Sequence, residues 1–556
     1  MANATLIITN ASVLTMDERK PHAEAVAIAG ERIIAVGDRR SVEALAGQGT
    51  RIIDARGRTL LPGFVESHMH LFFGGAELTH LQLTGVYGAE AMIDKFRTFA
   101  AARPDQLLLM AQGADYAMLD HPLTRHDLDA VIADRPVAMT AYDHHTVWAN
   151  TAALRAAGLL HGAAMPPGHE VMMGPDGLAT GELREFEAFA PVVALGGEER
   201  AYLGIATGAE PASPPTPEQR ALDRTMLARG LAHCAAHGVT SIVNMDGNHY
   251  TLDLLREMQG AGNLSTRVKV PFHFKPQMDL VELDRAMAMT RDFNDDWLTS
   301  GFVKMFMDGV MDSGTAYRLD AYPDMPGHHA TPLFSQAAFD RVATEADRRG
   351  LQIAVHAIGD GAVRQTINGY AAARAANGAR DSRHRIEHIE LIDRADVPRL
   401  ADLGIVASLQ PSHAPGAMDF AAFPALDKVG RDRWADSFLQ RTLADTGARI
   451  AFASDWPVTD VAVLRSIQAA LTRVPYGDCA DERLGLTDVL HAYTAGGAWA
   501  AHREHLVGRL VSGMAADLVL LDGDIGAVPA TGISTLGITL TVAGGRITHQ
   551  NGALRL

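Results

Sequence analysis

Cysteine is scarce in this sequence of 556 residues, which contains only Cys234 and Cys479. The two thiols could pair, but two in so long a chain do not form a disulfide framework, so we expect a reducing compartment. The N-terminal stretch MANATLIITNASVLTMDERK lacks the basic start and the long apolar run of a signal peptide. No apolar stretch approaches the length of a membrane helix. A cytoplasmic protein without a membrane span is therefore the expectation.

Positive charge is also in short supply, because 49 Lys and Arg stand against 66 Asp and Glu. The resulting formal net charge of -17 opposes non-specific binding to nucleic acid or to an anionic membrane surface. We therefore expect neither as a partner. What remains is the composition of a globular protein, 47% hydrophobic and 21% charged, in a chain long enough for more than one domain.

Both ends of the chain consist of short apolar runs separated by turns, as in residues 25–37 and 540–547. This pattern predicts β-strands. Neither end is large enough to make a well-packed domain alone. We therefore predict one small β-sandwich domain, formed from residues 1–60 and 506–556.

The centre of the chain alternates strand-like and helix-like runs, a pattern typical of α/β proteins. One helix is predicted over 217–237, where Thr216 can cap the first turn and Gln219 can complete a capping box. Nine strand candidates occur, whereas a closed (β/α)8 TIM barrel takes eight. The candidates are Phe64–His70, Val137–Ala141, Thr240–Met245, Arg267–Phe274, Phe302–Asp308, Ile353–His356, Arg385–His388, Ile405–Leu409 and Ile450–Ser454.

One of these candidates, Val137–Ala141, lies in the interval 75–215, which is far longer than a barrel crossover requires. The interval ends in a proline-rich linker at residues 211–217. We predict that residues 61–505 form the barrel and that 75–215 form a domain inserted over its mouth, where the insert would help to close a substrate pocket. The predicted fold class is α/β: a TIM barrel with an inserted domain, plus the terminal β-sandwich domain.

The clearest chemical motif is His68-Met69-His70, at the end of the first predicted barrel strand. Side chains two residues apart on a strand point to the same face, so the two imidazoles converge. A parallel barrel brings all its strand ends to one face, where barrel enzymes place their active sites. Four histidines and one aspartate on that face suit zinc or a similar divalent ion. The further ligand candidates at later strand ends are Lys304, His356, His388 and Asp455.

Together these motifs resemble the amidohydrolase superfamily of metal-dependent hydrolases. Within it, the chain resembles the YtcJ-like branch (amidohydrolase family 3), which includes N-substituted formamide deformylases. The resemblance covers nearly the whole chain. The runs that carry it, besides Leu61–Phe64 and the His-x-His, are Val303–Gly309, His356–Asp360, Arg385–His388, Ala453–Pro457 and Gly513–Val519.

The resemblance implies two metal ions per chain, with Zn²⁺ the expected metal. In binuclear members the strand-1 histidines and the strand-8 aspartate hold one ion, the histidines of strands 5 and 6 hold the other, and a carboxylated strand-4 lysine bridges them. An ammonium group cannot ligate a metal, whereas the carbamate formed with carbon dioxide is an anion that can. A mononuclear site with an ordinary lysine is the alternative. Carried over, the ligands are His68, His70, Lys304, His356, His388 and Asp455.

The expected reaction is hydrolysis of a C–N amide bond, in an N-acyl or N-formyl amide of an apolar amine, by a metal-activated hydroxide. Asp455 would take the proton from the water and pass it to the leaving nitrogen. A cyclic amide or ester hydrolase and a deaminase stay open as alternatives, although His356–Asp360 departs from the His-Ala-x-Glu run of adenosine-deaminase-like members. The non-enzymatic alternative is a degenerate barrel that only binds, and the intact ligand series argues against it.

Four further residues are substrate-binding candidates, each with a purely structural alternative. His145 lies in a segment resembling the family's His-x-x-Trp-x-Asn, and Glu185 occupies the family's glutamate position. Gln410 ends the seventh strand, and Trp456 directly follows Asp455. The expected partner is a small-molecule amide, and a homodimer is implied by the resemblance alone.

Overall fold

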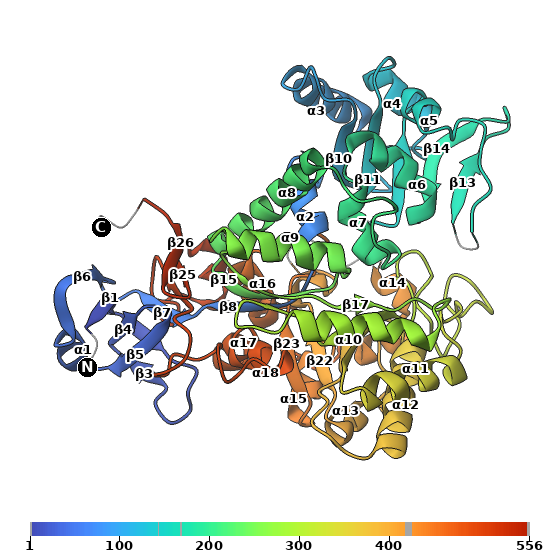
Figure 1. Cartoon of the computed structure of the whole chain (residues 1–556). Helices are drawn as coiled ribbons and strands as arrows, with labels where there is room; N and C mark the ends of the chain where they lie inside the picture. Colours follow the sequence, from blue (N-terminus) through green and yellow to red (C-terminus); the bar gives the residue numbers. More distant parts are fainter. Residues whose placement is uncertain (1–2, 143, 167–168, 418–424, 553–556) are drawn as a thin grey trace. The chain divides into compact units, whose positions relative to one another are not determined.

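The computed structural model describes residues 3–142, 144–166, 169–417 and 425–552. Its chain divides into two compact units. The larger consists of Met1–Leu71 and Leu231–Leu556, and the smaller of Phe72–Gly230. Figure 1 shows the chain coloured along its sequence, with the elements labelled as in the text.

The larger unit contains a barrel of parallel strands that pair in sequence order, except where the third strand is interrupted. The last strand returns to the first: the Asp455 N–H donates to the His68 carbonyl (3.0 Å), and the His70 N–H donates to the Trp456 carbonyl (2.8 Å). This is a barrel of the (β/α)8 type, as predicted. Its strands are β8 (Phe64–Met69), β15 (Val239–Asn244), β16 (Arg267–Lys269), β17 (Phe272–His273), β19 (Phe302–Phe306), β20 (Gln352–Ala357), β21 (Arg385–His388), β22 (Val406–Leu409) and β23 (Arg449–Phe452).

The third barrel strand differs from the prediction of one strand over Arg267–Phe274. It is broken into β16, which pairs with β15, and β17, which pairs with β19. Pro271 separates them, and proline has no N–H to donate to a sheet ladder. The Pro271 carbonyl also lies so close to Gly247 that a Cβ on that glycine would come within 1.8 Å of it. The third strand is therefore interrupted at Pro271, and no larger side chain fits at Gly247.

Helices separate the barrel strands along the chain or follow the last of them. The predicted capping box is present at the start of α8 (Pro217–Ala236), where Thr216 Oγ1 accepts the Gln219 N–H (3.3 Å) and Gln219 Oε1 accepts the Thr216 N–H (2.9 Å). The other helices of this kind are α9 (His249–Gly260), α10 (Leu283–Asp292), α11 (Gln336–Arg348), α12 (Asp360–Asn377), α13 (Val397–Leu403), α15 (Gln440–Asp445), α16 (Val463–Thr472), α17 (Leu486–Ala492) and α18 (Ala495–Ala500).

The two ends of the chain share one six-stranded sheet, β26-β25-β24-β7-β2-β3, in which β7 pairs antiparallel with β24. A second sheet, β5-β4-β1-β6, contributes to the same apolar core, which contains Ile8, Leu60, Leu518 and Leu540. The strands are β1 (Ala4–Thr9), β2 (Ser12–Leu14), β3 (His22–Ala23), β4 (Ala25–Ala29), β5 (Arg32–Gly37), β6 (Ala46–Asp54), β7 (Thr59–Pro62), β24 (Leu518–Leu521), β25 (Ile538–Ala543) and β26 (Arg546–Gln550).

The smaller unit has its own sheet, β13-β14-β12-β11-β10-β9, and its own apolar core around Phe96, Met139 and Trp148. The ninth strand candidate, Val137–Ala141, is β11 of this sheet and lies outside the barrel, as predicted. The remaining elements are β9 (Leu81–Gln82), β10 (Leu109–Ala114), β12 (Thr146–Ala149), β13 (Glu170–Met173), β14 (Ala179–Arg184), α3 (Ala89–Ala101), α4 (Arg125–Val131), α5 (Thr151–Ala156), α6 (Phe186–Val193) and α7 (Glu199–Ala206).

Both cysteines are free thiols, with Cys234 buried and Cys479 partly exposed. A search of the described part of the chain finds no helix with the length and apolar character needed to cross a membrane.

Candidate metal centre

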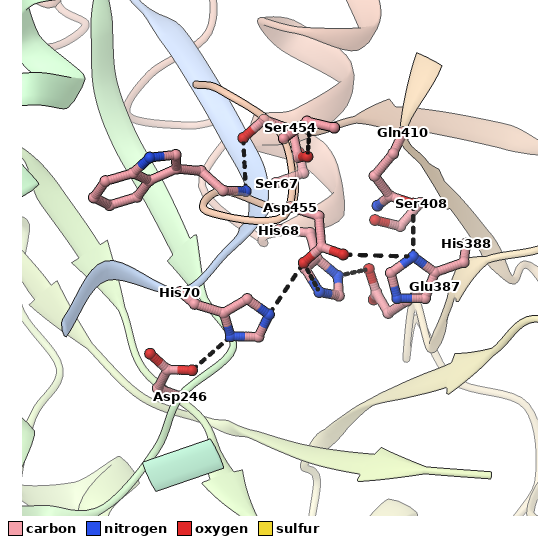
Figure 2. A network of polar contacts seen from close by, with 12 residues as sticks. Ser67, His68, His70, Asp246, Glu387, His388, Ser408, Gln410, Ser454 and Asp455 are labelled. Atoms are coloured by element: carbon pink, nitrogen blue, oxygen red, sulfur yellow. Dashed lines mark hydrogen bonds and ion pairs between the residues drawn. The ribbon is translucent and has the colours of Figure 1, made fainter. Parts of the chain in front are cut away.

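Three predicted ligands meet in one buried cluster at the strand ends of the barrel (Figure 2). One ring nitrogen each from His68 and His388 and one carboxylate oxygen of Asp455 lie within 4.8 Å of one another. His70 joins them, because its Nε2 lies 3.0 Å from Asp455 Oδ1, which is also 3.2 Å from His68 Nε2. The strands β8, β21 and β23 position these side chains: His68 lies near the end of β8 and His70 directly follows it, His388 ends β21, and Asp455 lies three residues after the end of β23.

Two carboxylates fix the protonation of His68 and His70. His68 Nδ1 contacts Glu387 Oε2 (2.7 Å), and His70 Nδ1 contacts Asp246 Oδ1 (2.5 Å). An ionised carboxylate only accepts hydrogen bonds, so each Nδ1 carries a proton and each Nε2 is the nitrogen left for a metal ion. Both Nε2 atoms face Asp455 Oδ1. Two imidazole nitrogens and a carboxylate oxygen that converge in this way need a proton or a metal cation between them, and the donor set fits a divalent metal.

His388 and His356 are held in the same manner by neutral acceptors. His388 Nδ1 lies 2.9 Å from Gln410 Oε1, and His356 Nε2 donates to the Gly309 carbonyl (3.0 Å). The other nitrogen of each ring keeps its lone pair, and the two ring centroids are 4.5 Å apart. Burial lowers the pKa of His388 well below its usual range and, with the charge of Lys304, that of His356 to about 3. Both rings are therefore neutral, which is the form that binds metals.

The field of the site favours positive charge. Burial alone would lower the pKa of His70, but the charges of Asp246 and Asp455 raise it to about 9. Glu387 is also ionised: burial would raise its pKa, yet the Arg385 guanidinium and the bond from His68 hold the pKa well below its usual value. Three carboxylates thus surround this pair of histidines, and a bound cation would offset their mutual repulsion.

Arg385 anchors the carboxylate that orients His68. It is fully buried and holds both oxygens of Glu387, through Nε (2.8 Å) and Nη2 (3.0 Å). Its Nη2 also donates to the Ser67 carbonyl (2.6 Å) and to Ser408 Oγ (2.9 Å). Strands β21, β8 and β22 are thereby tied together beneath the cluster, which limits the movement of the His68 ring.

Lys304, on β19, is fully buried, and its Nζ has no hydrogen-bond partner among the described residues. The neighbouring strand β17 places His273 at the same register. His273 is equally buried, and neither of its ring nitrogens has a partner in the described chain. The ring of Phe306 lies beside both, 4.8 Å from Lys304 Nζ and 5.5 Å from the His273 ring. Burial lowers the pKa of Lys304 to about 8 against the charges of Glu387 and Asp455.

The four substrate-binding candidates have different surroundings. Gln410 contacts His388 through Oε1, while its Nε2 is buried without a hydrogen-bond partner among the described residues. Trp456 is buried, and its ring packs against His233. His145 and Glu185 belong to the smaller unit, where His145 Nδ1 lies 3.0 Å from Glu185 Oε1.

Sequence reasoning missed the residues that orient the ligands, namely Asp246, Glu387 and Arg385. Asp246 lies two residues after the end of strand β15, and that position near a strand end was the available signal. Asp308, by contrast, acts on the backbone near the site. It accepts the N–H groups of Ile358 and Gly359 (3.1 and 2.9 Å) and so shapes the turn after His356.

Comparison with known proteins places this architecture in a class. The structure is similar to that of an uncharacterized metal-dependent hydrolase from Pyrococcus horikoshii, with a TM-score of 0.74 and 23% identity. The similarity covers 94% of this chain and 99% of the Pyrococcus chain. In sequence, the chain is 29% identical to the protein LONG AFTER FAR-RED 3 of Arabidopsis thaliana, over 93% of this chain and 87% of that protein. It is 27% identical to YtcJ of Bacillus subtilis (strain 168), over 97% and 98%. It is 25% identical to the N-substituted formamide deformylase of Arthrobacter pascens, over 93% of each.

The barrel and its cluster of histidines and carboxylates define a metal-dependent hydrolase. The amidohydrolase family matches residues 51–549, and the chain belongs to that family. The resemblance seen in the sequence motifs is thereby confirmed, and the protein is a hydrolase of carbon–nitrogen bonds.

Proposed function

We propose that the protein hydrolyses the amide bond of an N-acyl or N-formyl amide whose amine is apolar. The observation that carries the chemistry is the convergence of the Nε2 atoms of His68 and His70 on Asp455, with the Nδ1 protons already engaged by other residues. The likeness to an N-substituted formamide deformylase over almost its whole length supports the substrate class.

The centre would hold two divalent ions, with Zn²⁺ best suited to this mixture of imidazole and carboxylate ligands. His68, His70 and Asp455 would hold one ion. His356 and His388 would hold the other. Lys304 would lie between them as a carbamate, because an ammonium group has no lone pair to offer.

Lys304 Nζ and both ring nitrogens of His273 are buried without a hydrogen-bond partner among the described residues, and this supports the carbamate. Carboxylation joins the neutral Nζ of Lys304 to the carbon of carbon dioxide, releases one amine proton, and leaves the negative charge on the oxygens. A carbamate oxygen could then accept an N–H from His273, which otherwise has no partner among the described residues. The modification would therefore satisfy two buried polar groups that cost free energy when left alone.

When bound, the metal ions lower the pKa of a water molecule and so supply the nucleophile. Asp455 takes the proton of that water and delivers it to the nitrogen of the departing amine, acting first as base and then as acid. Glu387 and Asp246 keep the two histidines in the tautomer that leaves Nε2 available. The Nε2 donor of Gln410 is suited to hold the substrate carbonyl.

The first test is elemental analysis of the purified protein with its intact mass under non-denaturing conditions. We expect two divalent ions per chain and the added mass of one carbon dioxide. A single ion without added mass would make Lys304 an ordinary lysine and overturn the bridged centre.

The second test is a substrate screen that distinguishes the candidate reactions by their products. N-formyl and N-acyl amines should release a free amine together with formate or another carboxylate. Release of ammonia from an aminated ring would instead identify a deaminase, and ring opening of a cyclic amide without a free second product would identify a cyclic-amide hydrolase. Either result as the main activity would overturn the proposed substrate class.

A further inference from the structure

A second cluster of metal-ligating side chains lies apart from the residues of the metal centre. His233 is in the last turn of α8 and His237 follows the helix end, four residues further on, so both rings lie on one face. Their centroids are 4.6 Å apart. Asp460, in the segment after β23, places Oδ1 3.5 Å from His233 Nε2. One ligand atom from each of these three residues lies within 4.8 Å of the others.

The hydrogen bonding of His237 prepares it as a ligand. Its Nδ1 lies 2.9 Å from the His233 carbonyl oxygen, which can only accept, so Nδ1 carries the proton and Nε2 keeps the lone pair. Metal-binding histidines are commonly oriented by such a bond to a backbone carbonyl. The same arrangement orients His356 in the metal centre.

The distance between His233 and Asp460 also suits a shared ion. At 3.5 Å the contact is too long for a good hydrogen bond. Two ligand atoms bound to one tetrahedral zinc ion, with bonds of about 2.0–2.1 Å, lie about 3.4 Å apart. The side chains of His233 and Asp460 are 25% and 46% exposed, so an ion can reach them from solvent.

We propose that His233, His237 and Asp460 bind one further divalent cation of the zinc type, with water completing its coordination. This ion holds the segment after β23 against the end of α8. The segment matters because Trp456, which packs on the His233 ring with the centroids 5.3 Å apart, directly follows Asp455. The site would therefore steady the backbone that carries Asp455, whichever substrate the enzyme uses.

Zinc stoichiometry tests the site in the enzyme with its metal centre loaded. In equilibrium dialysis against Zn²⁺, the wild-type protein should bind one more ion per chain than the double variant H233A/H237A. H249A is the matched control: His249 is also exposed and contacts Asp253 four residues on (3.2 Å), but it belongs to no three-ligand group in the described chain. H249A should bind as many ions as the wild type. Equal binding by the wild type and the double variant would overturn the site.

The single variant H237N keeps a polar side chain and removes one imidazole ligand, so it provides a second test if the double variant does not fold. Cu²⁺ added to the loaded wild-type enzyme should quench the fluorescence of Trp456. The variant W456F lacks this tryptophan and so identifies its share of the quenching. H237N should lose the same share. Quenching that is the same in H237N and the wild type would contradict the assignment.

Hydrogen exchange tests the effect on the segment. Zn²⁺ should slow exchange of the backbone amides between residues 458 and 461 in the wild type and leave them unchanged in H233A/H237A. Binding of the additional ion without slower exchange would overturn the proposed role in holding the segment.

Discussion

Two carboxylates determine which nitrogen of His68 and His70 can bind a metal. Glu387 and Asp246 contact the Nδ1 atoms of these rings, whereas Asp455 contacts the Nε2 atoms. Without them the rings could rotate or exchange tautomers, and the lone pairs would no longer be fixed toward Asp455.

We predict that D246A weakens metal binding about 10- to 100-fold, the usual cost of removing such an orienting group. Competition with a chelator would measure the affinity. D253A is a suitable control, because Asp253 contacts only the exposed His249 among the ion pairs described for it. An unchanged affinity in D246A would show that the His70 tautomer is set by other means.

Asp455 carries the proposed proton transfer, and D455N should therefore lower turnover by at least about 10²-fold. Asparagine has nearly the same shape, so the far-ultraviolet circular dichroism should stay that of the wild type. Metal content must be measured in parallel, since Asp455 is also a proposed ligand. Retained turnover would refute the proton shuttle.

His273 offers a test of the carbamate that does not depend on activity. The protein is reconstituted with metal and ¹³C-labelled bicarbonate, and the carbamate carbon is observed by NMR. H273A should show a weaker carbamate signal and fewer bound ions than the wild type, because one donor to the carbamate is lost. A full signal in H273A would assign His273 a packing role only.

At the scale of elements, the local pattern of the sequence was enough to associate the proposed ligands with barrel strands, although Lys304 lies in the middle of β19 and Asp455 lies three residues beyond β23. Each ligand follows a short apolar run, and parallel strands bring such ends together whatever lies between them. The partners of these ligands were not predictable in this way. Glu387 meets His68 across 319 residues of sequence, and Asp246 meets His70 across 176. Such contacts depend on the barrel closing in one register.

Backbone conformation at the strand ends was also beyond the sequence. His388 and Asp455 have φ values of +79° and +61°, in the left-handed region that most residues avoid. Such conformations persist at functional sites because the surrounding contacts enforce them. The break in the third strand does have a signal in the sequence, Pro271. The prediction of one continuous strand followed the apolar neighbours of Pro271 instead.

Strand β16 carries a second buried lysine, Lys269, whose Nζ donates to Gln352 Oε1 (2.9 Å) and to the Ala501 carbonyl (3.2 Å). Burial, with the charges of nearby arginines, lowers its pKa from 10.5 to about 7. Between those values the unfolded chain binds a proton that the folded protein has released. Stability should therefore rise with pH across this range, by up to about 1.4 kcal/mol per pH unit from this group.

The variant K269M should show a flatter dependence of unfolding free energy on pH between 7 and 9.5 than the wild type. Denaturant unfolding at several pH values would measure the two slopes. K95M, which removes an exposed lysine, should keep the wild-type slope. Equal slopes in K269M and the wild type would show that Lys269 titrates alike in both states.

At the scale of the whole molecule, one buried ion pair joins the barrel to the terminal sheets. Arg267 of β16 holds both oxygens of Asp517, just before β24, at 2.7 and 3.0 Å. Both side chains are almost fully buried, and the ring of Trp297 stacks on the guanidinium at 4.3 Å. Asp517 also accepts the N–H of Gly544 (2.7 Å), so it organises the turn between β25 and β26.

We predict that D517A destabilises the protein by about 3–5 kcal/mol, because it leaves the Arg267 charge buried without its partner. The shift of the denaturation midpoint would measure this effect. The double variant R267M/D517L should recover a large part of the loss, since apolar groups of similar size need no charge partner. A double variant no more stable than D517A would indicate that the bonds of Asp517 to the turn dominate.

The sheet that contains both β7 and β24 also sets a limit on when the protein can finish folding during synthesis. Strand β7 leaves the ribosome about 450 residues before its partner β24. At about 5–20 residues per second, it waits roughly 20–90 s for that partner. During this time the edge of β7, which includes Leu60 and Leu61, has unpaired backbone groups that can join a foreign strand. A nascent chain that stalls before residue 518 therefore exposes an unpaired strand edge that is prone to aggregation, and it would depend on chaperones or be degraded.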